Sequence, residues 1–153
     1  MTAPTQGGRR LDLKRGRVDL THGAGGRAMM QLIAEIFHAA LDNDWLRRGD
    51  DQAAFDVAGG RMVMTTDAYV VSPLFFPGGD IGSLAVHGTI NDLAMAGAVP
   101  LYLTASFILE EGFALADLKR IAQSMGDASP MLSAMRRRSA SRNPSSRMKL
   151  ADR

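Results

Sequence analysis

Four aspartates are the side chains of this sequence best suited to chemistry. Asp50 and Asp51 are adjacent, Asp67 lies near the end of a β-branched run, and Asp92 interrupts an apolar stretch. Mg²⁺ binds a few carboxylate oxygens together with phosphate oxygens and water. Acids that arrive from separate elements suit that chemistry, although their spacing is not diagnostic. For Asp92 the alternative is an exposed carboxylate on the outer face of a helix.

A glycine-rich stretch, THGAGG at residues 21–26, directly precedes a helical pattern. Backbone N–H groups at the start of a helix attract anions, because they lack internal partners and lie at the positive end of the helix dipole. The stretch is therefore a candidate phosphate cradle. The alternative is a plain, flexible entry to the helix.

Helices and strands are predicted to alternate around these residues. Apolar residues at helical spacing predict helices over 26–41, 80–96 and 114–127. β-branched and aliphatic runs predict two short strands within 49–71, joined by a Gly-Gly turn, and a third strand over 101–109. The predicted fold class is therefore α/β (α+β), with a small mixed sheet backed by helices.

The helix over 80–96 has the clearest predicted ends. Asp80 is a residue type that caps helix N-termini, and it follows a Pro-Gly-Gly turn. Gly97 precedes Pro100 and suits a C-terminal stop. We therefore expect this helix to start and finish close to those residues.

Composition restricts the class of protein. A chain of 153 residues with 46% hydrophobic content is long enough for one domain with a core. It contains no cysteine, so disulfides and thiolate metal sites are excluded and the cytoplasm is the expected compartment. Neither a secretory leader nor a membrane-spanning run is evident, so we expect no membrane association.

Charge is distributed unevenly along the chain. Residues 130–153 contain seven Lys and Arg residues and one Asp, whereas the preceding part is acidic on balance. A basic tail can bind nucleic acid, but this one has no aromatic residue for stacking. We therefore favour a disordered tail over a nucleic-acid partner. The expected organisation is a flexible segment 1–19, a domain 20–129 and the tail 130–153.

Three stretches together resemble a known family. They are THGAGGRAMMQLI from Thr21, DDQAAFD from Asp50, and TTDAYVVSPLFFPGGDIGSLAVHGTINDLAMAGAVPLYLTASFILEEGF from Thr65. They are similar to the amino-terminal domain of the HypE family of hydrogenase maturation proteins. That family belongs to the superfamily of aminoimidazole ribonucleotide synthetase and selenophosphate synthetase. The resemblance extends from about Asp19 to Ser129 and implies a PurM-like, ATP-binding N-terminal domain.

The resemblance implies a reaction and a set of ligands. Such proteins use ATP to dehydrate a carboxamide, carried on a C-terminal cysteine, to a thiocyanate that supplies the iron cyanide ligands of [NiFe]-hydrogenase. The implied nucleotide residues are His22, Gly23, Ala24, Gly25, Gly26, Asp67 and Asn91. The implied Mg²⁺ residues are Asp50, Asp51, Asp67 and Asp92. The implied partners are a second copy of the chain, the carbamoyltransferase HypF and the HypC–HypD complex.

The chain departs from the family pattern after Ser129. The family continues with a GDTK-type motif and a second domain that ends in the acceptor cysteine, whereas residues 130–153 are rich in Arg and Ser and carry no such motif. We therefore expect a truncated chain with a frameshifted tail, inactive as a carbamoyl dehydratase. The alternative is a non-catalytic module for dimerisation or interaction within the maturation machinery.

Overall fold

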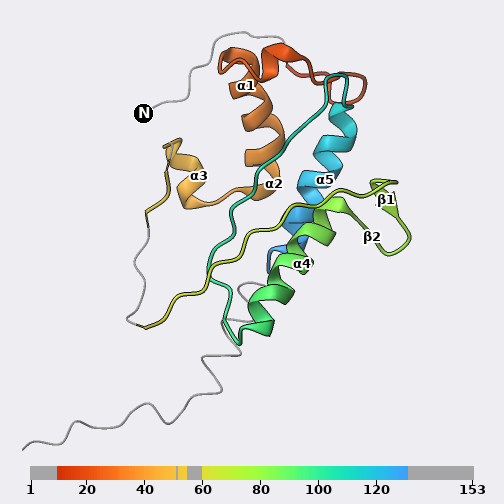
Figure 1. Ribbon diagram of the computed structural model, residues 1–153. Helices are drawn as coiled ribbons and strands as arrows, with labels where there is room; N and C mark the ends of the chain where they lie inside the picture. The colour runs from red at the N-terminus through yellow and green to blue at the C-terminus, as the bar shows by residue number, and fades with distance from the viewer. Residues whose placement is uncertain (1–9, 51, 55–59, 131–153) are drawn as a thin grey trace, which may run out of the picture. The chain divides into compact units, whose positions relative to one another are not determined.

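The computed structural model describes residues 10–50, 52–54 and 60–130 (Figure 1). They divide into two compact units. The described residues within Met1–Phe55 and Phe107–Gln123 form the first unit, and those within Asp56–Ser106 and Ser124–Arg153 form the second. Each unit is therefore formed by segments that are distant in the sequence.

Helices dominate the first unit. Its elements are the 3₁₀ turn η1 (Leu20–His22), α1 (Arg27–Leu32), the π-helical η2 (Ile33–His38), α2 (Ala39–Leu41), α3 (Asp44–Arg48) and most of α5 (Leu115–Ala128). α1, η2 and α2 follow one another without a break, so they form one helical rod over 27–41. This rod confirms the helix predicted over 26–41.

The core of the first unit lies between this rod and α5. Its buried members are Val18, Leu32, Ile36, Leu115, Leu118 and Ala122. Leu115, Leu118 and Ala122 recur at helical spacing on one face of α5, because residues three or four apart in a helix point the same way. The helix predicted over 114–127 is thus confirmed, together with its apolar face.

The segment before η1 packs against this core. Val18 exchanges backbone hydrogen bonds with the turn before α5: its N–H donates to Phe113 O at 2.8 Å, and its carbonyl accepts from Gly112 N–H at 2.7 Å. Leu11 and Leu13 contact the core cluster. Residues 10–18 therefore pack against the core, because removing their apolar side chains from water is favourable.

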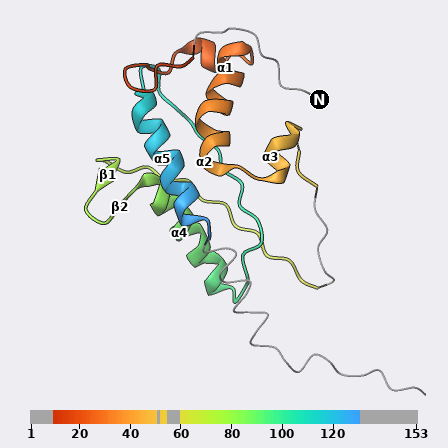
Figure 2. The same cartoon turned by 180° about the vertical axis from the view of Figure 1, so that it is seen from behind.

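The second unit is centred on α4 (Ile81–Met95), which a short hairpin precedes (Figure 2). β1 (Phe75–Phe76) pairs antiparallel with β2 (Gly79–Asp80), with Phe75 opposite Asp80. Pro77 and Gly78 form the connecting turn, and Gly78 has φ +93°, a conformation that side chains disfavour. The hairpin therefore delivers Asp80 directly to the start of the helix.

Asp80 caps α4 as predicted. Its Oδ1 accepts the N–H groups of Gly82 at 2.8 Å and Ser83 at 3.0 Å, and Ser83 Oγ lies 3.1 Å from the Asp80 nitrogen. This reciprocal capping box satisfies donors that a helix start leaves unpaired. At the other end Gly97 has φ +66° and its N–H donates to Ala94 O, which confirms the predicted stop.

Replacement of Asp80 with alanine should lower the free energy of unfolding by about 2 kcal/mol, the upper end for a lost N-cap, because Asp80 is buried. Asp80→Asn is the matched control, since an amide oxygen still accepts both N–H groups. Urea unfolding followed by circular dichroism measures the difference. Equal losses for the two variants would contradict a capping role.

The strands predicted within 49–71 and over 101–109 are wrong for the residues that the structure describes. Residues 52–54, 60–71 and 101–109 have no ladder partner, and the described sheet is the two-stranded hairpin. β-branched residues favour an extended chain, but a strand also needs a neighbour that supplies hydrogen bonds. Residues 51 and 55–59, where much of the first predicted strand falls, lie outside the described residues.

Among the described helices, none combines the length and the apolar character needed to cross a membrane.

Candidate functional site

The predicted site residues belong to both units. His22–Gly26 and Asp50 lie in the first unit, and Asp67, Asn91 and Asp92 lie in the second. Asp51 lies outside the described residues. Asp50 is exposed and follows Gly49, which ends α3 in the left-handed conformation.

Asp67 and Asp92 belong to two neighbouring hydrogen-bonded groups in the second unit, both of which include residues of the 65–69 segment. Tyr69 donates its phenolic hydrogen to Asp67 Oδ2 at 3.0 Å, and its oxygen lies 3.5 Å from Thr89 Oγ1. Thr65 Oγ1 donates to Asp92 Oδ2 at 3.4 Å. We call these five residues, Thr65, Asp67, Tyr69, Thr89 and Asp92, the Tyr69 cluster.

The residues of the Tyr69 cluster are brought to the same side of their elements by the spacing of side chains in an extended segment and in a helix. Thr65, Asp67 and Tyr69 alternate along an extended segment, so their side chains lie on the same side of it. Thr89 and Asp92 are three residues apart on α4, so they share a helix face. Asp92 lies in the last turn of α4 and is exposed, as the alternative interpretation predicted, and Thr65 donates a hydrogen bond to it. Asn91 is exposed on α4.

Burial raises the pKa of the Tyr69 phenol above its usual value. The hydrogen bond with Thr89 lowers this pKa, whereas the hydrogen bond to Asp67 and the charges of Asp67 and Asp92 raise it. Both carboxylates therefore act electrostatically on one hydroxyl. Tyr69 stays a neutral donor at physiological pH, because a phenolate beside two carboxylates is disfavoured.

The donor set suits a cation that arrives with phosphate. Within the described part of the chain, no group of three or more His, Asp or Glu side chains could hold a metal ion. Mg²⁺ is commonly held by one or two carboxylates, with phosphate oxygens and water in its remaining positions. Asp67 and Asp92 each accept from a neutral hydroxyl, so a cation held here would need further ligands from outside the protein.

The glycine-rich stretch of the first unit turns sharply into α1. The N–H groups of His22, Gly23 and Ala24 donate to the carbonyls of residues 19–21. Gly25 has φ +74° and Gly26 caps α1 without a side chain. Three of the N–H groups expected to cradle phosphate are thus used in the turn, and the phosphate role of His22–Gly26 stays a prediction.

His22 has a structural role in this turn. Its ring is buried, and Nδ1 lies 3.1 Å from both the backbone nitrogen and Oδ1 of Asp19. Asp19 also accepts hydrogen bonds from the hydroxyl and the N–H of Thr21. The hydrogen bond from the Thr21 hydroxyl is the main cause that lowers the pKa of Asp19 below its usual value. The Thr21 N–H and His22 lower this pKa further.

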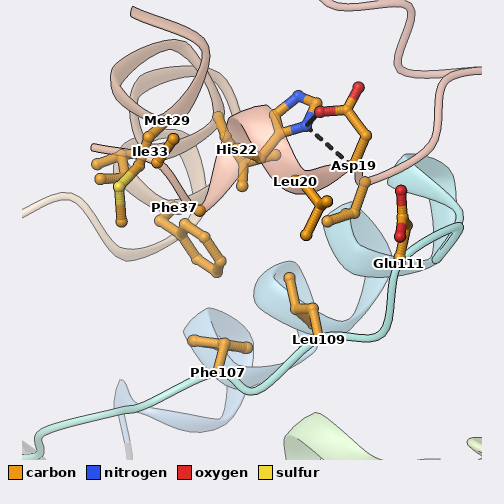
Figure 3. Close-up of a pocket in the computed structure, with 13 residues that line it drawn as sticks. Asp19, Leu20, His22, Met29, Ile33, Phe37, Phe107, Leu109 and Glu111 are labelled. Atoms are coloured by element: carbon orange, nitrogen blue, oxygen red, sulfur yellow. Dashed lines mark hydrogen bonds and ion pairs between the residues drawn. The ribbon is translucent and has the colours of Figure 1, made fainter. Parts of the chain in front are cut away.

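A cavity of about 430 Å³ lies beside the same turn in the first unit (Figure 3). Met29, Ile33, Phe37, Phe107 and Leu109 form its apolar lining, and Asp19, His22 and Glu111 lie toward one end. The Phe37 and Phe107 ring centroids are 4.6 Å apart. Two carboxylates at the polar end disfavour phosphate binding inside this cavity.

Sequence reasoning missed Thr65, Tyr69 and Thr89. The signals that could have found them are the alternate spacing of Thr65, Asp67 and Tyr69 and the helical spacing of Thr89 and Asp92. Neither spacing predicts that the two segments lie near each other, because that contact depends on the tertiary fold.

Residues 49–134 match the family described as AIR synthase related protein, N-terminal domain. The chain belongs to this family. The match includes the whole Tyr69 cluster and α4, and it confirms the PurM-like fold class expected from the sequence.

Curated relatives agree with this family. The chain is 78% identical over 121 residues to the carbamoyl dehydratase HypE of Rhizobium leguminosarum bv. viciae, with 79% of this chain and 35% of the relative covered. It is 50% identical over 115 residues to the carbamoyl dehydratase HypE of Escherichia coli (strain K12), with 72% of this chain and 34% of the relative covered. The chain thus spans about a third of the length of the curated relatives it matches.

A solved structure is similar in fold. It is described as the hydrogenase maturation protein HypE in complex with ATP, and it is 50% identical with a TM-score of 0.71. The similarity covers 74% of this chain and 33% of that chain. The resemblance to HypE proteins predicted from the sequence is confirmed.

Proposed function

We propose that this chain supplies nucleotide-binding elements of a HypE-type protein that matures [NiFe]-hydrogenase in the cytoplasm. The observation that carries the proposal is that one extended segment hydrogen-bonds two acids from separate elements of a family domain: Tyr69 donates to Asp67 of the segment itself, and Thr65 donates to Asp92 of α4. The similar HypE structure in complex with ATP supports ATP as the nucleotide. Asn91, beside Asp92 on α4, is a further candidate for the nucleotide.

The proposed chemistry is an ATP-dependent dehydration. Transfer of the γ-phosphoryl group from ATP to the oxygen of an S-carboxamide releases ADP and one amide proton. Loss of phosphate together with the second amide proton then yields the thiocyanate. Mg²⁺, when bound, would neutralise charge on the phosphates. Asp67 and Asp92 would hold that cation, and Thr65 and Tyr69 would hold the two carboxylates through neutral hydroxyls.

The thiol that carries the carboxamide is not among these residues, because the sequence contains no cysteine. The described chain therefore offers nucleotide contacts rather than the acceptor of the carbamoyl group. We propose HypF as the donor of that group and the HypC–HypD complex as the recipient of cyanide in the complete system.

Equilibrium dialysis of the chain against ATP, with Mg²⁺ or with excess EDTA, tests the proposal. We expect weak, millimolar binding that requires Mg²⁺, since a cation must join the phosphates to the carboxylates. ATP binding that is unchanged by EDTA would contradict a carboxylate-bound cation.

A second candidate function is a non-catalytic module that pairs with another copy of the chain. The exposure of apolar residues on the extended segments favours it: Val70 is 99% exposed, Ile108 98% and Met64 87%. Extended segments without a ladder partner are ready to pair with strands of another molecule. The proposed homodimer would complete the sheet that the sequence predicts.

Lysine at both Val70 and Ile108 should therefore shift the chain toward a monomer of 16.4 kDa in sedimentation velocity. Thr66→Lys is the matched control, because it adds charge to the same extended segment at an exposed polar position. Association that persists in the double variant, or that the control weakens equally, would contradict pairing through these segments.

A further inference from the structure

Tyr69 connects the extended segment to α4 through its hydroxyl. The phenol has one hydrogen, which it donates to Asp67 Oδ2 at 3.0 Å. Thr89 Oγ1, 3.5 Å away, is then the donor toward the phenolic oxygen. The hydroxyl therefore links a carboxylate of one element to a hydroxyl of the other.

Gly88 makes this position of Tyr69 possible. A Cβ at residue 88 would lie 2.2 Å from the Tyr69 hydroxyl oxygen and 2.8 Å from Cζ, closer than real contacts allow. Glycine inside a helix costs stability relative to alanine. A glycine in the middle of α4, under the phenol, thus accommodates the tyrosine at some cost to the helix.

The donors that hold the two carboxylates are neutral. Asp67 accepts from the Tyr69 phenol and Asp92 accepts from the Thr65 hydroxyl. An Arg or Lys in these places would form a charged pair and compete with a bound cation. A hydroxyl fixes the direction of a carboxylate while leaving its negative charge for a cation.

We propose that Tyr69 is a positioning residue, whose hydroxyl fixes the Asp67 carboxylate for the cation of a bound nucleotide, with Gly88 providing the space. This inference rests on the proposed function. It assigns to Tyr69 and Gly88 a role in cation affinity, in addition to their packing against each other.

The first test needs no ligand. In the full chain labelled with ¹³C and ¹⁵N, three-bond couplings report the χ1 rotamer of Asp67 by NMR. We expect one dominant rotamer in the unaltered chain and averaged couplings in Tyr69→Phe, which keeps the ring and removes the hydroxyl. Gly88→Ala should give the same averaging, because it displaces the phenol. Unchanged Asp67 couplings in Tyr69→Phe, or averaged couplings already in the unaltered chain, would overturn the proposal.

The second test uses Mn²⁺ in the presence of ATP as the probe and measures paramagnetic broadening. Tyr69→Phe should raise the apparent dissociation constant for Mn²⁺ about five- to tenfold, the effect expected when one hydrogen bond to a charged ligand is lost. Thr66→Val is the control, since Thr66 alternates to the other side of the segment. An equal effect of Thr66→Val would overturn the proposal.

Asp67→Asn separates this inference from the proposed function. If Asp67→Asn abolishes the broadening and Tyr69→Phe leaves it unchanged, the cation site stands and the positioning role of Tyr69 is contradicted. If broadening near residue 67 is absent from the unaltered chain or unaffected by Asp67→Asn, the cation site itself is contradicted. Circular dichroism of each variant shows whether its helices are intact.

Discussion

Replacing Leu118 with alanine should lower the free energy of unfolding by about 3 kcal/mol. Leu118 is fully buried in α5 and belongs to the core cluster of the first unit, with Ile36 and Ala122. Truncation removes buried methyl groups and leaves a cavity that the neighbouring helices fill only in part. Because small domains are stable by roughly 5 to 15 kcal/mol, this loss should be evident in urea unfolding.

Leu46→Ala is the matched control for this prediction. Leu46 is also a helical leucine, in α3, but 36% of it is exposed. Its truncation should cost less than about 1 kcal/mol, since less apolar surface is lost from contact. Equal costs for the two leucines would contradict the core described for the first unit.

Removal of both carboxylates of the Tyr69 cluster should weaken nucleotide binding by a free energy similar in size to the loss of stability in Leu118→Ala. In Asp67→Asn/Asp92→Asn we expect the affinity for Mg²⁺–ATP to fall at least about a hundredfold, roughly 2.7 kcal/mol. Amides keep the size and hydrogen bonding of the side chains, so folding should be little changed. What is lost is the negative charge that a Mg²⁺ ion needs from the protein.

Helices and their ends could be predicted from the sequence because their causes are local. Asp80 caps donors two and three residues away, and Gly97 ends the same helix through its own backbone conformation. The apolar face of α5 follows from spacing alone. Each of these features depends on residues within one or two turns, so a short window contains the necessary information.

Strand pairing and the Tyr69 cluster depend on distant residues. The runs over 61–71 and 101–109 have strand-like composition, but composition does not supply the neighbour that a ladder needs. Tyr69 and Gly88 are matched in space across 19 residues of sequence. The acids Asp67 and Asp92 could be singled out by type, whereas the hydroxyls that hold them could not.

Equilibrium dialysis of Mg²⁺–ATP with the unaltered chain and with Asp67→Asn/Asp92→Asn tests the central claim most directly. Asp44→Asn is the control, since Asp44 is an exposed carboxylate of α3 whose ion pair with Arg47 contributes little. We predict saturable binding by the unaltered chain and by Asp44→Asn, and no measurable binding by the double variant. Equal binding by all three chains would contradict a nucleotide site at Asp67 and Asp92.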